Sequence, residues 1–371
     1  METLRTIESQ PPRRFLLGLT LLLVAAAPVV LAQKLPMATR IWSVGPLTKG
    51  EPVMGIAFGP GGPTVTGPHV DSQTGSIYAA THSVAFAGDR VVVASRIGMR
   101  KVEGTAAPEE IYELLSLDIK DGKVENTREI PAFASLPIFA TDDAHLIVAG
   151  PKLLRLTPDL RDDGSFDYHS TGHRFGSVEN VSPDGSTLGN ATSPGFELID
   201  ARTLKATQLT TSPAVDTSVS SKGYLTDNVH WIGEYPKDLG FVTYVDAQGQ
   251  HLIYHGNCGG RPQFLTNELV LEPGCKNPLL IDIHGNLVRT LPTKGGFSFA
   301  GVSQNGKQFA LQVLHSAKQE RFVIYSVETG EPVTEVKPGE VAEEQSWTAF
   351  SPDGSLFVVG SPLKLTLYRL P

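Results

Sequence analysis

The chain has 371 residues and a formal net charge of −8, from 31 Lys and Arg against 39 Asp and Glu. This acidic balance argues against nucleic acid or an anionic membrane surface as a partner. The 37 glycines and 27 prolines are spread along the chain, which is typical of many short strands and tight turns rather than of a helical bundle. The composition therefore predicts an all-β fold with a sizeable core.

The N-terminal segment has the pattern of an export signal. An arginine pair precedes an uncharged stretch of 18 residues, Phe15 to Ala32. Val30 and Ala32 put small residues at −3 and −1 of a predicted cleavage before Gln33. We therefore expect residues 1–32 to be a signal peptide.

The mature chain, residues 33–371, is then predicted to be periplasmic or secreted. The alternative is an uncleaved segment, because 18 apolar residues approach the ~20 that span a bilayer. In that case the protein would be anchored in the inner membrane through this segment, which is the only membrane contact that we expect.

The first part of the mature chain is less regular than the rest. The segment RIWSVGPL from Arg40 is a predicted strand with no sequence neighbour to pair with, and a Gly/Pro-rich insertion begins at Gly55. The residues PEEIYELLS from Pro108 fit a short helix or the start of a strand, and the repeat register favours the strand.

One sequence unit, an apolar strand that ends in a polar corner, then recurs every 36 to 46 residues. This period is typical of a four-stranded propeller blade of roughly 40–45 residues. The equivalent corner positions are Asp118, Thr157, Asp200, Asp246, Asp282 and Val327.

A second unit marks another corner, with VSPDGSTLGNA from Val181, VSQNGKQFALQ from Val302 and FSPDGSLFVVG from Phe350. Asp or Asn followed by Gly predicts a tight hairpin turn, because the side chain caps the backbone and Gly accepts a positive φ.

Together the two units predict a single β-propeller domain of seven four-stranded blades. The last blade contains only three strands of its own. We expect the segment from Arg40 to supply the fourth strand and so close the ring without an open sheet edge. The predicted blades span 51–133, 134–172, 173–213, 214–259, 260–296, 297–338 and 339–371.

The motifs SPDGSTLGN, SQNGKQFAL and SPDGSLFVV resemble those of the WD40-like and TolB-like exported bacterial propellers. The resemblance implies a six-bladed or seven-bladed ring whose loops bind proteins, peptides or sugars, with active sites in the central funnel of a minority. The chain departs from true WD40 repeats because the Trp-Asp dipeptide is missing from every blade.

The two cysteines, Cys258 and Cys275, flank a predicted strand pair. In an exported protein two thiols favour a disulfide, which would connect one blade to the next. A redox-active or metal-binding pair is the alternative, although the spacing lacks a CxxC motif.

Several side-chain groups are candidates for metal or catalytic sites, and each of them favours a structural interpretation. His251 and His255 would lie ~13 Å apart along a strand. The other candidates are the loop pair His169 and His173, the calcium-like segment Asp159, Asp163, Gly164 and Asp167, the acid pairs Asp142 with Asp143 and Glu343 with Glu344, and Ser298 in GFSFAG.

No linear catalytic motif is present. The sequence therefore predicts a non-catalytic binding or scaffolding module for a protein, peptide or glycan, with no catalytic residue and no cofactor. The alternative is a lactonase-like or glycan-cleaving enzyme, in which several blades would hold a divalent ion in the central funnel.

Overall fold

Residues 35–371 form one compact unit in the computed structural model. The residues that the structure describes are 35–45, 55–59, 62–66, 69–70, 77–78, 80–100, 109–132, 136–168, 176–192, 195–210, 218–230, 239–256, 260–293, 297–314, 320–338, 347–361 and 364–371.

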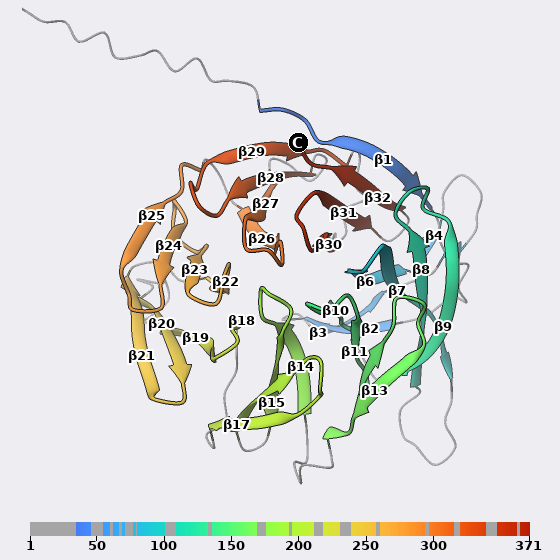
Figure 1. Ribbon diagram of the computed structural model, residues 1–371, viewed down its shortest axis with the longest axis horizontal. Coiled ribbons are helices and arrows are strands. Elements are labelled where there is room, and N and C mark those ends of the chain that lie inside the picture. Colours follow the sequence, from blue (N-terminus) through green and yellow to red (C-terminus); the bar gives the residue numbers. More distant parts are fainter. Residues whose placement is uncertain are drawn as a thin grey trace, which may run out of the picture. The chain divides into compact units, whose positions relative to one another are not determined.

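Seven antiparallel sheets of four strands stand around a central axis, as predicted (Figure 1). The first three blades, each given from its innermost to its outermost strand, are β6 (Ala80–Ala87), β7 (Arg90–Arg100), β8 (Glu109–Asp118) and β9 (Val124–Ala132); β10 (Ile138–Ala140), β11 (Leu146–Ala149), β12 (Leu153–Leu156) and β13 (Asp162–Phe166); and β14 (Gly176–Val181), β15 (Thr187–Thr192), β16 (Gly195–Asp200) and β17 (Ala206–Thr210).

The next three blades repeat this arrangement, and they consist of β18 (Ser218–Val219), β19 (Gly223–His230), β20 (Leu239–Asp246) and β21 (Gly249–Gly256); β22 (Gln263–Phe264), β23 (Leu269–Glu272), β24 (Leu279–Asp282) and β25 (Leu287–Thr290); and β26 (Phe297–Val302), β27 (Gln308–Leu314), β28 (Glu320–Ser326) and β29 (Pro332–Val336). The seventh blade combines β30 (Trp347–Phe350), β31 (Leu356–Ser361) and β32 (Lys364–Arg369) with β1 (Thr39–Val44).

The N-terminal strand closes the ring, which confirms the predicted pairing. β1 runs antiparallel to β32, from Thr39 opposite Arg369 to Val44 opposite Leu365 (Figure 1). The residues just before β1 also reach the sixth blade, where Met37 forms a parallel bridge with Glu335 of β29. The sequence did not predict this second contact, through which one short segment joins two blades.

The irregular first part of the chain contains two hairpins, and the helix considered at Pro108 does not form. The insertion contains β2 (Gly55–Gly59) paired with β3 (Gly62–Thr66), and β4 (His69–Val70) paired with β5 (Ile77–Tyr78). Residues from Glu109 onward belong to β8 instead. The backbone amides and carbonyls of β8 are satisfied by pairing with β7 and β9.

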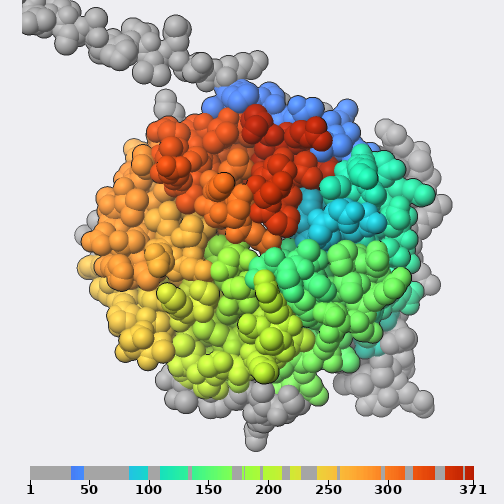
Figure 2. Space-filling model, in the orientation of Figure 1, coloured from blue at the N-terminus to red at the C-terminus, as the bar shows by residue number. Residues whose placement is uncertain are grey.

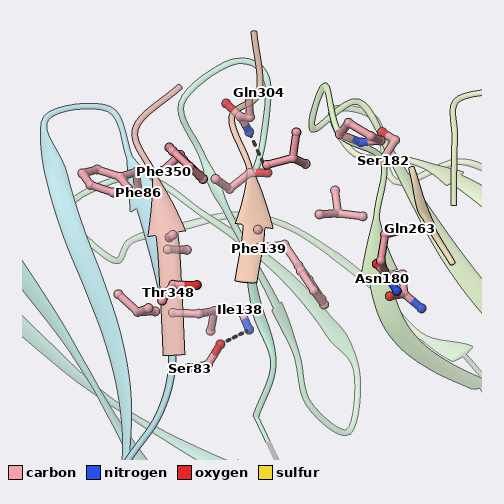
Figure 3. Close-up of a pocket in the computed structure, with 18 of the residues that line it drawn as sticks. Ser83, Phe86, Ile138, Phe139, Asn180, Ser182, Gln263, Gln304, Thr348 and Phe350 are labelled. Atoms are coloured by element: carbon pink, nitrogen blue, oxygen red, sulfur yellow. Dashed lines mark hydrogen bonds between the residues drawn. The ribbon is translucent and has the colours of Figure 1, made fainter. Parts of the chain in front are cut away.

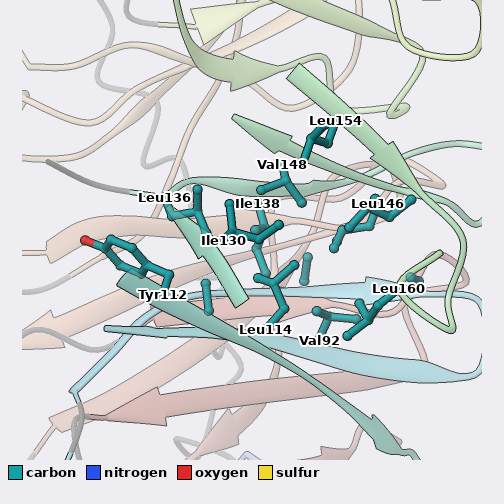
Figure 4. Packing of buried hydrophobic residues seen from close by; sticks show 14 of the residues in the cluster. Val92, Tyr112, Leu114, Ile130, Leu136, Ile138, Leu146, Val148, Leu154 and Leu160 are labelled. Carbon is teal, nitrogen blue, oxygen red and sulfur yellow. The ribbon is translucent and has the colours of Figure 1, made fainter. Parts of the chain in front are cut away.

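The core is divided into seven apolar clusters, and each cluster fills the interface between two neighbouring blades. Figure 4 shows the cluster between the first two blades, where Val92, Tyr112 and Leu114 face Leu146 and Val148. Each fully buried side chain of this size stabilises the fold by roughly 1.5–3 kcal/mol. Side-chain packing between the sheets therefore makes a large contribution to holding the blades together.

The repeated SPDG corner joins the innermost strand of a blade to the second strand. In the third blade the Ser182 hydroxyl donates to Asp184 at 2.6 Å and accepts the Thr187 amide at 3.0 Å. Gly185 follows with a φ of 75°, which L side chains rarely adopt. The same hydroxyl contact recurs between Ser303 and Asn305 at 2.7 Å and between Ser351 and Asp353 at 2.6 Å.

The other repeated corner joins the third strand to the outermost strand, at the same end of the blade as the SPDG corner. Here an aspartate closes the turn by accepting the backbone amide two residues later. The four examples are Asp118 with Lys120 at 2.7 Å, Asp200 with Arg202 at 3.1 Å, Asp246 with Gln248 at 2.9 Å and Asp282 with His284 at 2.9 Å. The carboxylates that mark the sequence period therefore act as turn caps.

Candidate functional site

The innermost strands of all seven blades surround a central channel with a cavity of about 310 Å³. Each of these strands pairs with one neighbour only, so its second edge faces the axis. Figure 2 shows the blades meeting closely around this axis. Every blade therefore contributes to the channel, and representative lining residues are Phe86, Phe139, Asn180, Ser218, Gln263, Gln304 and Trp347.

The described lining of this channel is uncharged. It contains apolar side chains, serine, threonine, asparagine and glutamine, but no Asp, Glu, His, Cys, Lys, Arg or Tyr. General acid–base catalysis and metal coordination both depend mainly on those absent residue types. The lining is therefore suited to binding a neutral group.

Hydroxyl groups in the channel connect the innermost strands of neighbouring blades. Ser83 Oγ accepts the Ile138 amide at 3.3 Å (Figure 3), and Ser218 Oγ accepts the Phe264 amide at 3.1 Å. The Thr348 hydroxyl donates to the Ala300 carbonyl. These contacts satisfy backbone groups at strand edges that have no further strand to pair with.

At the end of the channel that carries the SPDG corners, side chains bridge blades that are not neighbours. Gln304 Nε2 of the sixth blade donates to the Ala140 carbonyl of the second blade at 3.1 Å (Figure 3). Asn267 Nδ2 of the fifth blade donates to Asp184 of the third blade at 2.6 Å. The first contact links blades on opposite sides of the ring, and the second links two blades that have the fourth blade between them.

A charged network lies outside the channel, between the second and third blades. The buried Arg155 guanidinium donates to Asp143 at 2.6 Å, to Asp163 at 2.7 Å and to the Ala201 carbonyl at 2.9 Å. Burial raises the pKa of Asp143, but hydrogen bonds from Arg155 and Thr141 outweigh this effect and lower it to about 2. This network connects blades and shares no residue with the channel lining.

The histidines and carboxylates considered from the sequence do not converge on a site. His251 and His255 both lie in β21, where His251 Nε2 is 3.1 Å from Asp246 and the His255 ring stacks on Phe241 with centroids 4.6 Å apart. Within the part of the chain that the structure describes, no three His, Cys, Asp or Glu side chains are grouped as metal ligands.

In the calcium-like segment, carboxylates face arginines. Asp162 is 2.9 Å from Arg128, and Asp163 contacts Arg155. Asp142 and Asp143 lie in the turn between β10 and β11, and Ser298 lies in the innermost strand β26. His169, His173, Glu343 and Glu344 lie outside the described residues.

The structure describes one residue of the predicted cysteine pair. Cys275 lies between β23 and β24, with its sulfur 3.4 Å from the Tyr254 hydroxyl. Cys258 lies outside the described residues, so the disulfide stays a prediction.

The signal-peptide residues Ala32 and Gln33 also lie outside the described residues. Among the residues that the structure does describe, no helix has the length and apolar character needed to span a bilayer.

The strand pairing defines a seven-bladed β-propeller. No family model matches the sequence, and no curated protein matches it. The resemblance to the WD40-like or TolB-like group therefore has no support from a family model. The chain is similar to a solved structure described as "Structure of Dos1 propeller", with 14% identity and a TM-score of 0.45, over 90% of this chain and 95% of that chain. A likeness at this level carries no argument about function.

Sequence reasoning missed the channel residues. Each blade contributes only one to four of them, and Asn180, Gln263 and Gln304 are neutral amides without a recognisable motif. The usable signal was positional, because in the third, sixth and seventh blades the innermost strand directly precedes a predicted corner.

Proposed function

We propose that this chain is an exported, non-catalytic binding module whose central channel recognises part of a partner. The supporting observation is the channel itself, which all seven blades build and which has no titratable side chain in its described lining. A binding site needs shape and a few polar contacts. The metal-dependent enzyme considered above would need converging carboxylates or imidazoles, which this lining does not supply.

Export is the second part of the proposal, and it is supported by the uncharged stretch from Phe15 to Ala32 and by the small residues before Gln33. The test is to fractionate cells that express the full chain and to sequence the N-terminus of the purified protein. Gln33 as the first residue in a periplasmic or secreted fraction is expected. A mature protein that retains residues 1–32 in the membrane fraction would contradict cleavage.

The binding function is tested by cross-linking the exported chain in the cell envelope and identifying its partner by mass spectrometry. Gln263→Glu places a carboxylate in the channel with little change in shape. Gln250→Glu is the matched control, because Gln250 is exposed on the outermost strand β21. We expect capture of the same partner by the wild type and Gln250→Glu, with at least tenfold less by Gln263→Glu. Equal capture by all three would overturn the channel as the recognition site.

A further inference from the structure

We propose that β25, the outermost strand of the fifth blade, is an open edge to which an extended, uncharged segment of another protein adds as a further strand. This inference goes beyond the proposed function of the channel, because β25 lies on the rim of the ring and shares no residue with the channel lining. It is carried by the exposed side chains of β25, by its backbone edge and by the way in which the chain covers two other edges.

β25 carries two consecutive large apolar side chains that face solvent. Leu287 is 60% exposed and Val288 is 52% exposed, and all four residues of the strand are exposed. Among the described residues, the other exposed large apolar side chains are Met37 and Leu252. Single exposed apolar residues are ordinary, whereas a group of them marks an interaction site. β25 is therefore the outermost strand whose surface most favours a partner.

The backbone of β25 is paired on one side only. Its ladder with β24 runs from Thr290 opposite Leu279 to Leu287 opposite Ile281, and a register shift leaves Val288 without an opposite residue. On its other side, β25 has no partner among the described strands. Amide and carbonyl groups along this edge are therefore available to a further strand.

The outer edges of the other blades are covered, charged or less apolar. The N-terminal segment covers those of the sixth and seventh blades, β9 carries two exposed glutamates and β13 begins with two exposed aspartates. Charged side chains at a sheet edge disfavour strand addition. β17 and β21 lack a pair of exposed large apolar side chains. The one charged residue of β25, Arg289, lies over the sixth blade, because a Cβ atom added at Gly330 would collide with its side chain.

The chain's own N-terminal segment shows which kind of partner fits the rim. It runs extended past β29, which Met37 contacts through Glu335, and then pairs with β32 (Figure 1). At its start, Leu35 packs against the apolar cluster between the fifth and sixth blades, on one side of β25. The rim of these blades is convex (Figure 2), so a second rigid ring would touch it over a short length only. The partner is therefore inferred to be an extended chain segment rather than a second copy of this protein.

A cavity of about 460 Å³ lies near the start of β25 and can take one side chain of the added strand. Its lining includes Ile283 and His284, in the corner before β25, and the exposed Leu252 of β21. The lining contains no Lys or Arg, and its one carboxylate, Asp246, already accepts two backbone amides of its own turn. In strand addition, backbone hydrogen bonds give affinity and such side-chain pockets give specificity. This cavity therefore favours an uncharged residue in the partner.

Strand-forming peptides test this edge without the natural partner. Fluorescein-labelled TVTVTV, TETETE and TKTKTK, together with TVTVTV in which every amide is N-methylated, are titrated with the mature chain and followed by fluorescence polarisation. We expect TVTVTV to bind at least tenfold more tightly than the other three, because it combines apolar side chains with free backbone amides. Equal binding of the N-methylated peptide would overturn strand addition, and preferred binding of a charged peptide would overturn the apolar edge.

Leu287→Lys and Val288→Lys each place a charge on the edge, and both should weaken TVTVTV binding at least tenfold. Thr127→Lys is the matched control, because Thr127 is exposed on the outermost strand β9, and it should bind as the wild type does. Gln263→Glu, in the channel, should also bind normally, which separates this test from that of the proposed function. Undetectable TVTVTV binding by the wild type, or unchanged binding in both β25 variants, would overturn the proposal.

Hydrogen exchange measured by mass spectrometry locates the bound peptide. With TVTVTV present, amides of residues 287–290 should exchange at least tenfold more slowly, and those of β9 should not change. Protection of a different outermost strand would overturn β25 as the acceptor. Sedimentation of the mature chain alone should show a monomer. A dimer that Val288→Lys dissociates would overturn the extended partner in favour of a second copy of this chain.

Discussion

At the scale of single residues, Arg155 connects the second blade to the third, and no sequence motif indicates this role. Its side chain is only 5% exposed, and its guanidinium contacts two carboxylates and the Ala201 carbonyl of the neighbouring blade. A buried guanidinium is tolerated only when its donors are satisfied. Asp143 and Asp163 therefore keep Arg155 in place, and the three residues together fix the position of the second blade against the third.

This network makes a testable contribution to stability in acid. Because the pKa of Asp143 lies at about 2, below its ordinary 3.8, the charged carboxylate stabilises the fold by about 2 kcal/mol at neutral pH. That contribution is fully present above the ordinary carboxyl pKa and is lost as the pH falls through about 2. Arg155, Thr141 and His145 face this carboxyl, and Arg202 lies 4.0 Å away.

The measurement is the free energy of unfolding in urea between pH 7 and pH 2. Asp143→Asn should be less stable at pH 7 and should lose less stability on acidification than the wild type. Asp121→Asn, in an exposed turn, serves as the control. An acid dependence of Asp143→Asn equal to that of the wild type would contradict this assignment.

The SPDG corners predict a second effect at the residue scale. Ser303→Ala removes the hydroxyl that donates to Asn305 and accepts the Gln308 amide at 3.0 Å. Leaving such groups without partners should cost about 1–3 kcal/mol in the free energy of unfolding, measured by urea denaturation. Ser298→Ala, at an exposed site in the same blade, should change stability by less than ~0.5 kcal/mol. Equal effects would show that the corner hydroxyl is dispensable.

At the scale of elements, β1 is held by packing as well as by its ladder with β32. Trp42 is buried in the cluster between the seventh and first blades, and its indole nitrogen donates to the Ile119 carbonyl at 2.9 Å. One side chain therefore fastens the closing strand to the blade on its other side.

Trp42→Ala should lower the free energy of unfolding by about 3–5 kcal/mol, because it leaves a large cavity in this cluster. Trp42→Phe keeps most of the apolar surface and loses the hydrogen bond, so about 1–2 kcal/mol is expected. Chemical denaturation monitored by circular dichroism gives both values. If Trp42→Ala costs no more than Trp42→Phe, packing at this position does not hold β1.

The proposed disulfide also acts between elements, since Cys258 follows the last strand of the fourth blade and Cys275 lies within the fifth. Closing the 18-residue loop from Cys258 to Cys275 would stabilise the fold by roughly 3 kcal/mol in the chain-entropy model. Cys275→Ser should therefore lower the Tm without changing the circular dichroism spectrum. Two reactive thiols in denatured, unreduced wild-type protein would refute the bridge.

At the scale of the whole molecule, the ring depends on residues far apart in sequence. The Ala38 amide donates to the Glu335 carbonyl at 2.9 Å, and the Thr334 hydroxyl donates to the Pro36 carbonyl at 2.7 Å. With β1 on β32, these contacts cover the outer edges of two blades. Uncovered edges of this kind favour pairing with other chains.

Removing residues 35–44 from the mature chain should therefore lower the Tm by more than 10 °C and produce dimers or aggregates in size-exclusion chromatography. A synthetic peptide of the same ten residues should restore the monomer, because it can pair with β32 and β29. An unchanged Tm in the truncated chain would mean that the ring does not need this segment.

Much of the fold could be predicted because its signals are local. The turn at Asp184 and Gly185 needs only neighbouring residues to form, and the strand repeat fixes the number of blades. Ring closure was also predictable, since the last blade lacks one strand and the segment from Arg40 is left over. The same reasoning gave no candidate for Gln263 or Asn180.

The sequence by itself therefore determined the seven blades, the corners and the closing strand, because period, turn chemistry and strand count are properties of consecutive residues. Only the tertiary structure decided the uncharged lining of the channel, the contacts of Gln304 and Asn267 between non-neighbouring blades, and the environment of Arg155. These depend on contacts such as that between Gln304 and Ala140, 164 residues apart. The physical reason is that ring geometry brings together single neutral residues from different blades, and such residues leave no pattern along the chain.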